Sequence, residues 1–239
     1  MFGSENQKRI MLKRAKQSIA DVISAIAPKF WKSYSELSYW KNRKEEEGEL
    51  TNGYFSYFYT NHFGLTELDY KRKRVLDIGC GPRGSLEWAV MAKERVGLDP
   101  LADEYLEMGA DKHEMSYIAD SSEQIPYRDA HFDIVCSFDS LDRVDDLEQS
   151  IEEIKRVTTP GGYFLLIVKI NHEPTISEPQ TVLPDVIRKF KPEFICEDID
   201  VYPHDSKRHY QSIKLSKPVA DPMTYTEPGW LSAKFLRCV

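Results

Sequence analysis

The chain has 239 residues, a length that suits one α/β domain with additions and that can bury a substantial core. Its formal net charge of −7 argues against a nucleic-acid partner, because phosphate binding requires a basic face. No apolar run approaches the roughly 20 residues that span a bilayer, and no signal peptide is visible, so we expect a cytoplasmic protein. The four cysteines show neither a C-x-x-C pair nor metal-like spacing, and we expect reduced thiols.

Positive charge gathers near the N-terminus. Residues 1–44 hold ten lysines and arginines against three acidic residues. Apolar residues from Ile10 to Ile26 fall on one helical face before Pro28, which predicts a basic amphipathic helix over 1–27. Such a helix can contact an anionic membrane surface, pack on its own domain, or pack on a second subunit of a homodimer. We favour packing over membrane contact.

An aromatic-rich segment follows, from Phe30 to Phe63. Its pattern predicts helices with a polar break at 45–48. Aromatic side chains suit a cap that closes over a ligand pocket, although half or more of these rings must belong to the core. We therefore divide the chain into an N-terminal helical part over 1–72 and an α/β domain over 73–239.

From Lys73 onward, apolar runs typical of strands alternate with helical patterns, which predicts a mostly parallel sheet with helices on both faces. The last strand is either Tyr210–Leu215 or Leu231–Cys238, and we prefer the second. Helices are expected at Ser85–Met91, Leu101–Met108, Asp145–Val157 and Val182–Phe190. The other strands are expected at Val75–Ile78, Glu94–Leu98, Met115–Ala119, Phe132–Phe138, Tyr163–Val168 and Phe194–Tyr202, with a turn at 159–162 before the fifth.

A glycine turn separates the first expected strand from the first expected helix. Gly79, Gly81 and Gly84 stand where backbone amides and a helix N-terminus can meet a ligand. Asp99 ends the next strand about 20 residues later, where a carboxylate can take both ribose hydroxyls. This arrangement predicts a nucleotide site but does not choose between a nicotinamide dinucleotide and another nucleoside.

Five stretches together carry a family resemblance. They are Asp77-Ile78-Gly79-Cys80-Gly81, Asp99-Pro100, Asp120-Ser121, Phe132-Asp133-Ile134-Val135 and Pro160-Gly161-Gly162. In this order and spacing they resemble the class I S-adenosylmethionine-dependent methyltransferases, and more narrowly the small-molecule branch whose core motif is VLDIGCGxG. The resemblance covers residues 73–170. It implies a Rossmann-like fold with a seven-stranded, mostly parallel sheet, and S-adenosyl-L-methionine as the cofactor; nicotinamide-binding proteins lack these stretches as a set.

The resemblance also implies roles for single residues. The turn at Gly79–Gly81 would hold the methionine end of the cofactor, with Asp77 near its amino group. Asp99 would hold the ribose hydroxyls, and Asp120 would accept from the adenine amino group, although Asp120 suits a helix N-cap as well. Residues 137–139 would form the floor under the sulfonium. Pro100 or Leu101 would lie on the adenine face. The expected cofactor-binding residues are Asp77, Gly79, Cys80, Gly81, Asp99, Pro100, Leu101, Asp120, Ser121, Ser137 and Phe138.

The acceptor side offers few candidates for a general base. Relatives in this branch often carry a histidine after the fourth strand, whereas this chain has Leu141-Asp142-Arg143-Val144 there. His172 follows the fifth strand, at the sheet edge where ligands bind in open α/β folds, and its ordinary pKa near 6.5 suits a base. A structural hydrogen bond is the competing role for His172. Asp139 and Asp142 are the alternative bases, no role is assigned to His204 or His209, and no spacing suggests a metal site.

These features predict a methyltransferase that acts on a small molecule, with the aromatic segment and an insertion at 203–229 forming the acceptor pocket. We favour in-line O-methylation of a small metabolite or sugar-type hydroxyl. N-methylation of a small amine is the alternative, with acidic residues and tyrosines binding a cation. Two further hypotheses stay open: a catalytically silent methyltransferase fold that serves as a binding protein, and modification of a lipid-linked acceptor at a membrane.

Overall fold

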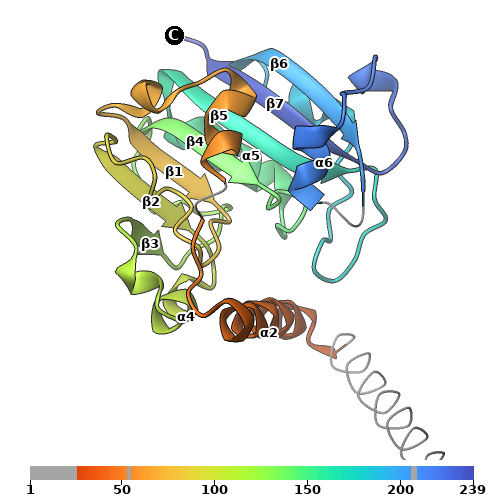
Figure 1. Ribbon diagram of the computed structural model, residues 1–239. Helices are drawn as coiled ribbons and strands as arrows, with labels where there is room; N and C mark the ends of the chain where they lie inside the picture. The colour runs from red at the N-terminus through yellow and green to blue at the C-terminus, as the bar shows by residue number, and fades with distance from the viewer. Residues whose placement is uncertain (1–25, 53–54, 206–208) are drawn as a thin grey trace, which may run out of the picture. The chain divides into compact units, whose positions relative to one another are not determined.

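The computed structural model describes residues 26–52, 55–205 and 209–239 (Figure 1). The chain divides into two compact units, residues 1–46 and 47–239. The basic helix predicted over 1–27 lies outside the described residues, except for its last two. In the first unit, α2 (Pro28–Glu47) begins at a proline, whose fixed φ suits a first helical turn. The helix ends before Gly48, whose φ of 84° is the left-handed conformation that stops helices, at the predicted polar break.

The second unit is built on a seven-stranded sheet with the order β3-β2-β1-β4-β5-β7-β6. Neighbouring strands pair in parallel except β7, which runs antiparallel to both β5 and β6. This confirms the expected Rossmann-like sheet and the preferred last strand, since Tyr210–Leu215 lies in helix α6 (His209–Leu215). The strands are β1 (Arg74–Ile78), β2 (Glu94–Leu98), β3 (Ser116–Ile118), β4 (Phe132–Phe138), β5 (Thr158–Ile170), β6 (Phe194–Pro203) and β7 (Gly229–Arg237).

The central strands carry apolar residues on both faces because both faces of the sheet are covered. Successive residues of β1 point to opposite faces, so they enter different parts of the core. Leu76 belongs to a buried cluster that contains Ile151 of α5 (Leu147–Val157). Val75 belongs to a second cluster that contains Phe63 of η1 (Asn61–Phe63). The aromatic segment therefore supplies part of the core on one face of the sheet, as predicted for many of its rings.

Most predicted helices occur, with shifted ends. α5 begins after Asp146, whose side chain accepts from the backbone N–H of Gln149 at 3.0 Å as an N-cap. The segment predicted over 182–190 forms a 3₁₀ helix, η4 (Pro184–Phe190), that begins at a proline. In the described ranges, none of the helices combines the length and the apolar character that crossing a bilayer requires. The other short elements are α3 (Ser56–Tyr59), η2 (Glu67–Tyr70), α4 (Ala102–Glu107), η3 (Ala110–Lys112) and η5 (Pro222–Thr224).

The helix predicted at Ser85–Met91 is absent, and the prediction was wrong. This segment is a series of turns, in which the backbone N–H of Ala89 donates to Leu86 O at 3.1 Å rather than to Ser85 O. The Ser85 carbonyl instead accepts from the indole Nε1 of Trp88 at 2.9 Å. A side chain has taken the place of a helical backbone donor, which the spacing of apolar residues does not reveal.

The fifth strand begins earlier than predicted, because the turn at 159–162 lies within β5. Its pairing with β4 passes from Phe132–Thr158 directly to Ile134–Tyr163, so the intervening residues form a break in register. Gly161 supplies the left-handed conformation there, with a φ of 74°. The rest of β5 continues as a buried central strand and carries the chain to the edge where the site lies.

Candidate active site

The candidate residues gather at one edge of the sheet. β2, β1, β4 and β5 are neighbours and run in parallel, so the turns that follow them leave at the same edge (Figure 1). Gly79 follows β1, Asp99 follows β2, Asp139 follows β4 and Asn171 follows β5. In open α/β sheets this carboxyl edge is where ligands bind.

The turn after β1 requires glycine on two counts. Gly79 has a φ of 71°, and a Cβ atom on it would lie 2.3 Å from the Cβ of Ser140. Ser140 donates its hydroxyl to Ile78 O at 2.8 Å, and its Oγ lies 2.6 Å from the Oγ of the fully buried Ser137. The side chains of Ser137 and Ser140 thus tie the turn after β4 to the turn after β1.

The acidic residue after β2 lies directly against the glycine turn. The buried Asp99 carboxylate accepts from the backbone N–H of Gly81 through Oδ2 at 3.3 Å, and from that of Leu101 through Oδ1 at 3.0 Å. Pro100, between them in sequence, is exposed, and Leu101 is buried. Residues 18 positions apart in the sequence are therefore in contact, so that one ligand can touch both.

Cys80 lies inside this turn, but its thiol points into the core. A Cβ atom added to Gly97 would lie 2.5 Å from the Cys80 Sγ, so the thiol fills the space that Gly97 leaves. Burial raises the pKa of Cys80 well above its ordinary value, which keeps the thiol protonated. Only the backbone of Cys80 is in a position to border a ligand at the turn.

Asp120 and Ser121 follow β3 at the same edge. The Asp120 Oδ1 accepts from the backbone N–H of Ser121 at 2.8 Å, and both residues are half-buried. Residues 122–124 form a turn, with Gln124 N–H donating to Ser121 O, rather than a helix. The helix N-cap role that the sequence left open for Asp120 therefore has no helix to cap.

Asp77 is buried at the end of β1 and receives a hydrogen bond from the aromatic segment. The hydroxyl of Tyr59 donates to Asp77 Oδ2 at 2.9 Å. Burial raises the pKa of Asp77 to about 7; the Tyr59 hydrogen bond opposes this rise and the charge of Asp99 adds to it. The sequence did not single out Tyr59, because nothing separates it from the other aromatic residues around it.

Phe138 lies at the end of β4, where a floor was expected. Its ring centroid is 4.5 Å from that of Tyr59 and 5.9 Å from that of Phe63, and the ring is buried. Tyr59 therefore contacts both the buried carboxylate of Asp77 and the aromatic ring of Phe138.

A strap formed by residues 47–51, at the start of the second unit, contacts the loop of the glycine turn. Arg83 forms a bidentate ion pair with Glu47, with N–O distances of 2.8 and 2.9 Å, and donates to Thr51 O at 3.2 Å. Further along, Lys112 pairs with the exposed Glu49 at 3.0 Å. Residues 47–51 are thus anchored to the loop that carries the glycines.

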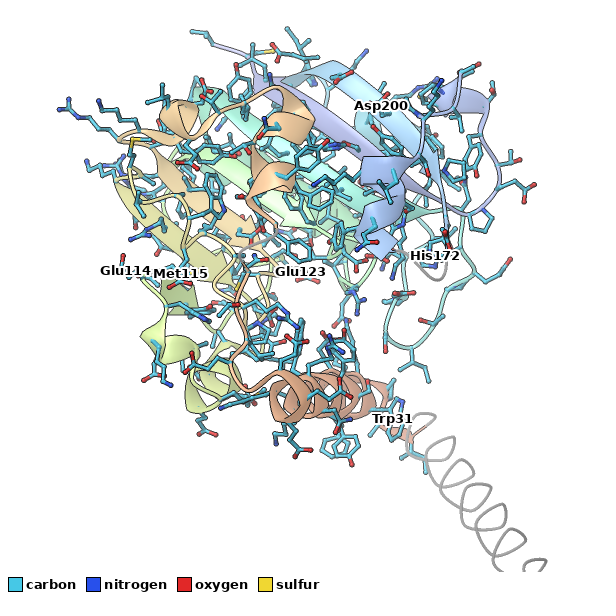
Figure 2. All side chains as sticks on the ribbon, in the orientation of Figure 1. Trp31, Glu114, Met115, Glu123, His172 and Asp200 are labelled. Carbon is cyan, nitrogen blue, oxygen red and sulfur yellow. The ribbon has the colours of Figure 1, made fainter. Side chains whose placement is uncertain are left out.

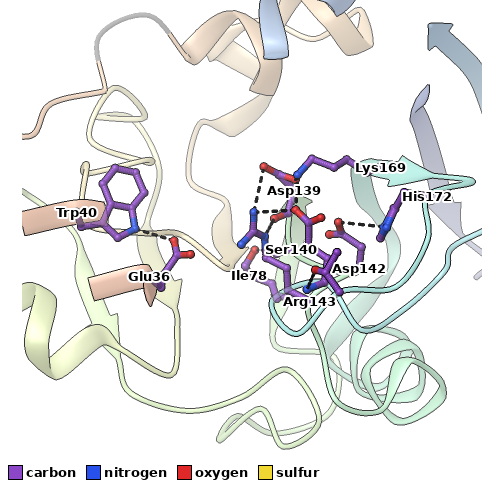
Figure 3. A network of polar contacts seen from close by, with 11 residues as sticks. Glu36, Trp40, Ile78, Asp139, Ser140, Asp142, Arg143, Lys169 and His172 are labelled. Carbon is purple, nitrogen blue, oxygen red and sulfur yellow. Dashed lines mark hydrogen bonds and ion pairs between the residues drawn. The ribbon is translucent and has the colours of Figure 1, made fainter. Parts of the chain in front are cut away.

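A cluster of charged side chains lies beyond the glycine turn, at the ends of β4 and β5 (Figure 3). Asp139, with a φ of 55°, pairs with Lys169 at 3.3 Å and with Arg143 at 3.8 Å. Burial raises the pKa of Asp139, although the charges of Arg143 and Lys169 oppose this rise. Glu178 pairs with the same two cations through Oε1, at 3.4 Å to Arg143.

His172 stands on the loop after β5 and faces this cluster (Figures 2 and 3). Its Nδ1 lies 2.9 Å from the backbone oxygen of Glu173, and its Nε2 lies 3.5 Å from Oδ2 of the fully buried Asp142. The Asp142 carboxylate raises the pKa of His172. Both ring nitrogens therefore face groups of the chain itself.

The cluster brings together residues that the sequence had named and residues that it had missed. Asp139, Asp142 and His172 were candidates from their places after strands. Lys169 and Glu178 were not, because a lysine inside an apolar strand and a glutamate in an irregular loop give no local signal. Only its place in the sequence, three residues before His172, connects Lys169 with this cluster.

The segment 203–229 also reaches this edge. Tyr210 of α6 stacks on the buried Trp230 with centroids 5.3 Å apart, and Lys169 Nζ lies 5.5 Å from the Trp230 ring. His204 is exposed and its ring is 6.2 Å from the same tryptophan. His209 is the first residue of α6.

Comparison with known proteins identifies the class of domain. Residues 76–166 match the family model for a methyltransferase domain. A malonyl-[acyl-carrier protein] O-methyltransferase from Erwinia billingiae is 30% identical over 148 residues, which are 56% of this chain and 59% of that protein. A norajmaline N-methyltransferase from Rauvolfia serpentina is 26% identical over 138 residues, 54% of this chain and 46% of that protein.

A solved structure has the same fold. The crystal structure of an S-adenosylmethionine dependent methyltransferase from Mesorhizobium loti superposes with a TM-score of 0.53 at 18% identity, and covers 72% of this chain and 94% of that one. The chain spans about half the length of the curated relatives it matches. The matched region contains the glycine turn, Asp99, Asp120 and the end of β4, and it stops within β5.

Proposed function

Because the chain belongs to the class I S-adenosylmethionine-dependent methyltransferase family, we propose that it transfers the methyl group of S-adenosylmethionine to a hydroxyl of a small molecule. One observation carries the proposal: the carboxylate of Asp99 touches the backbone of Gly81. Asp99, which is expected to hold the ribose, is thus adjacent to the turn at Gly79–Gly81, which is expected to hold the methionine end. S-adenosylmethionine joins a ribose and a methionine end in one molecule and requires this proximity.

The residues at this edge fit that cofactor. Because Gly79 has no Cβ atom, the side chain of Ser140 can occupy that space, and the turn after β1 can lie close to the turn after β4. Above about pH 7 the Asp77 carboxylate is charged and would bind the ammonium group of the tail. Asp120 and the exposed Pro100 flank the same edge, where an adenine ring would lie. When bound, S-adenosylmethionine supplies an electrophilic methyl group on a sulfonium.

The chain's own contribution is alignment and the exclusion of water. Phe138 and Tyr59 form an apolar surface next to Asp77, and α6 with Trp230 forms another beside Lys169. Side chains that hold an acceptor between these surfaces would place its nucleophile behind the methyl group. Such positioning lowers a barrier by roughly 7–11 kcal/mol without a covalent intermediate.

Asp139 is the group that we assign to the acceptor proton. It follows Phe138 directly, at the end of β4, which pairs with the strand β1 that leads into the glycine turn. Its raised pKa suits a base that works near neutral pH, and Lys169 and Arg143 stabilise its charged form. His172 is the second candidate; it would first have to release either Asp142 or the Glu173 carbonyl.

N-methylation of an amine is the alternative within the same fold, and the named relatives include both an O- and an N-methyltransferase. An acidic cluster would suit a cationic amine, but Lys169 and Arg143 already neutralise two of its three carboxylates. This charge balance is why we favour a neutral hydroxyl acceptor.

Calorimetry with the purified chain tests the proposal first. We expect S-adenosylmethionine to bind and a nicotinamide dinucleotide not to bind. A screen of hydroxyl and amine acceptors, read as release of S-adenosylhomocysteine, then separates O- from N-transfer. A chain that binds neither nucleotide would be a silent fold acting as a binding protein, and the proposed activity would be abandoned.

A further inference from the structure

We propose that Asp142, His172 and Glu178 bind one divalent metal ion, of the kind that imidazole and carboxylate ligands share, such as Zn²⁺. One potential ligand atom from each of the three residues lies within 4.8 Å of the others. The residues come from the loop after β4 and from two points of the loop after β5. This inference concerns metal binding and does not depend on methyl transfer.

The Asp142 carboxylate is the observation that calls for a cation. Its side chain has no exposed surface, and neither oxygen has a hydrogen-bond partner among the described residues. An isolated buried carboxylate is costly, so such groups are normally paired, protonated or bound to metal. Asp142 therefore needs a partner that a hydrogen bond does not supply.

His172 approaches Asp142 at a distance that suits a shared ion better than a hydrogen bond. Charge-assisted hydrogen bonds are about 2.7–2.9 Å long, whereas Nε2 of His172 is 3.5 Å from Oδ2 of Asp142 and makes no hydrogen bond to the part of the chain that the structure describes. Two ligands at about 2.0–2.1 Å on a tetrahedral zinc ion lie about 3.3 Å apart. The observed separation is close to this value.

The orientation of the imidazole agrees with a ligand role. Its Nδ1 is positioned to donate to the backbone oxygen of Glu173 at 2.9 Å, which leaves the lone pair on Nε2, the atom that faces Asp142. Metal-binding histidines are commonly fixed in this way by a carbonyl or carboxylate on the second nitrogen. Without a cation or an added proton, a lone pair and a carboxylate would face each other.

Glu178 supplies the third ligand of the proposed metal site. Its Oε1 pairs with Lys169 and Arg143, so coordination through Oε2 would leave those ion pairs in place. Three protein ligands leave a fourth tetrahedral position, the pattern of zinc sites that bind a substrate or water. The ion would lie next to Lys169 and hence beside Asp139, on the acceptor side of the site.

The test is metal binding by the full chain after treatment with a chelator. Calorimetry with Zn²⁺ should show one equivalent bound, and Asp142→Asn and His172→Gln should each weaken binding by more than about 100-fold, beyond the loss of an outer-shell partner. Glu173→Gln, an exposed acid next to His172, is the matched control and should bind like the wild type. Co²⁺ in place of Zn²⁺ should show a tetrahedral spectrum without thiolate charge transfer.

Two further readouts keep the outcome clear. Zn²⁺ should raise the unfolding temperature of the wild type and of Glu173→Gln but not of His172→Gln, because only binding to the folded state stabilises it. Failure of the wild type to bind, thiolate bands with Co²⁺, or equal binding by the ligand variants would overturn the inference. The affinity for S-adenosylmethionine is measured separately, and it tests the proposed methyl transfer independently of the metal site.

Discussion

The two sides of the candidate site are built in different ways. On the cofactor side, backbone groups and glycines make the contacts, as in the hydrogen bond from Gly81 to Asp99. On the acceptor side, long side chains from separate loops form ion pairs, as between Lys169, Asp139 and Glu178. Backbone contacts depend on a short local motif, whereas the ion pairs can change residue by residue. The first side is thus suited to a constant ligand and the second to a variable one.

The largest effect is expected from Gly79→Ala, which should destabilise the cofactor side as a whole. The new Cβ would clash with Ser140 and the residue would keep a left-handed φ, so we expect a loss of about 2–5 kcal/mol in unfolding free energy. Gly64→Ala is the control, because Gly64 has a φ of 66° but open space around it. It should lose only about 1–2 kcal/mol of unfolding free energy, measured by urea titration. Equal losses would show that the packing against Ser140 is unimportant.

On the acceptor side, Asp139→Asn should lower kcat by about 100- to 10,000-fold, the usual contribution of a general base. Its affinity for S-adenosylmethionine should stay within a few fold of the wild type. The exposed Asp185→Asn is the matched control and should leave kcat unchanged. If His172→Gln abolished turnover while Asp139→Asn did not, the base would be His172 and our assignment would be wrong.

The hydrogen bond from Tyr59 to Asp77 predicts a dependence on pH. The folded-state pKa of Asp77 is about 7 and its ordinary value is 3.8, so the folded chain holds an extra proton between them. This contribution to stability is therefore present at low pH and is lost as pH rises from 3.8 to about 7. Tyr59→Phe removes a hydrogen-bond donor to the Asp77 carboxylate. It should therefore increase the unfolding free energy that is lost when Asp77 ionises above pH 7.

Urea titrations at several pH values check this expectation. Tyr59→Phe should match the wild type more closely at pH 5 than at pH 8, apart from a constant offset. Titratable groups that interact with Asp77 include Tyr59, Asp99, Cys80, Cys136 and Tyr70, and of these only Tyr59 is altered in this variant. A difference between the two proteins that does not vary with pH would show that the Tyr59 hydrogen bond does not lower the pKa of Asp77.

The smallest effect is expected from the strap over the glycine turn. Glu47→Gln breaks the bidentate pair with Arg83 and should cost about 0.5–1 kcal/mol, because both side chains are partly exposed. Glu49→Gln should cost less than Glu47→Gln, because Glu49 and its partner Lys112 are both exposed and water screens their attraction. A larger loss for Glu49→Gln than for Glu47→Gln would mean that the pair with Arg83 does not anchor the strap.

The same contrast explains what could be predicted from the sequence. The motif around Gly79 and the spacing to Asp99 located the first side, because local spacing determines a strand, a turn and a following strand. Ser85–Met91 was predicted as a helix because its apolar spacing is helical, whereas the Trp88 side chain takes the Ser85 carbonyl. A side-chain hydrogen bond of this kind leaves no trace in periodicity.

The acceptor side was only partly predictable for a related reason. His172 was found from its place after a strand, but its partner Asp142 is 30 residues earlier and Glu178 lies in a loop without periodic structure. Their proximity is created by the parallel pairing of β4 with β5, and no short motif encodes it. The same holds for Tyr59, which reaches Asp77 from a segment before the sheet.

The central claim is that the Asp99 carboxylate and the glycine turn hold the two ends of one S-adenosylmethionine molecule. Calorimetric titration of Asp99→Asn, beside the exposed Asp103→Asn as control, tests it most directly. Loss of charge-assisted hydrogen bonds should weaken binding by about 10- to 100-fold in Asp99→Asn, with no change in Asp103→Asn. Unchanged affinity in Asp99→Asn, or tighter binding of a nicotinamide dinucleotide by the wild type, would contradict the account.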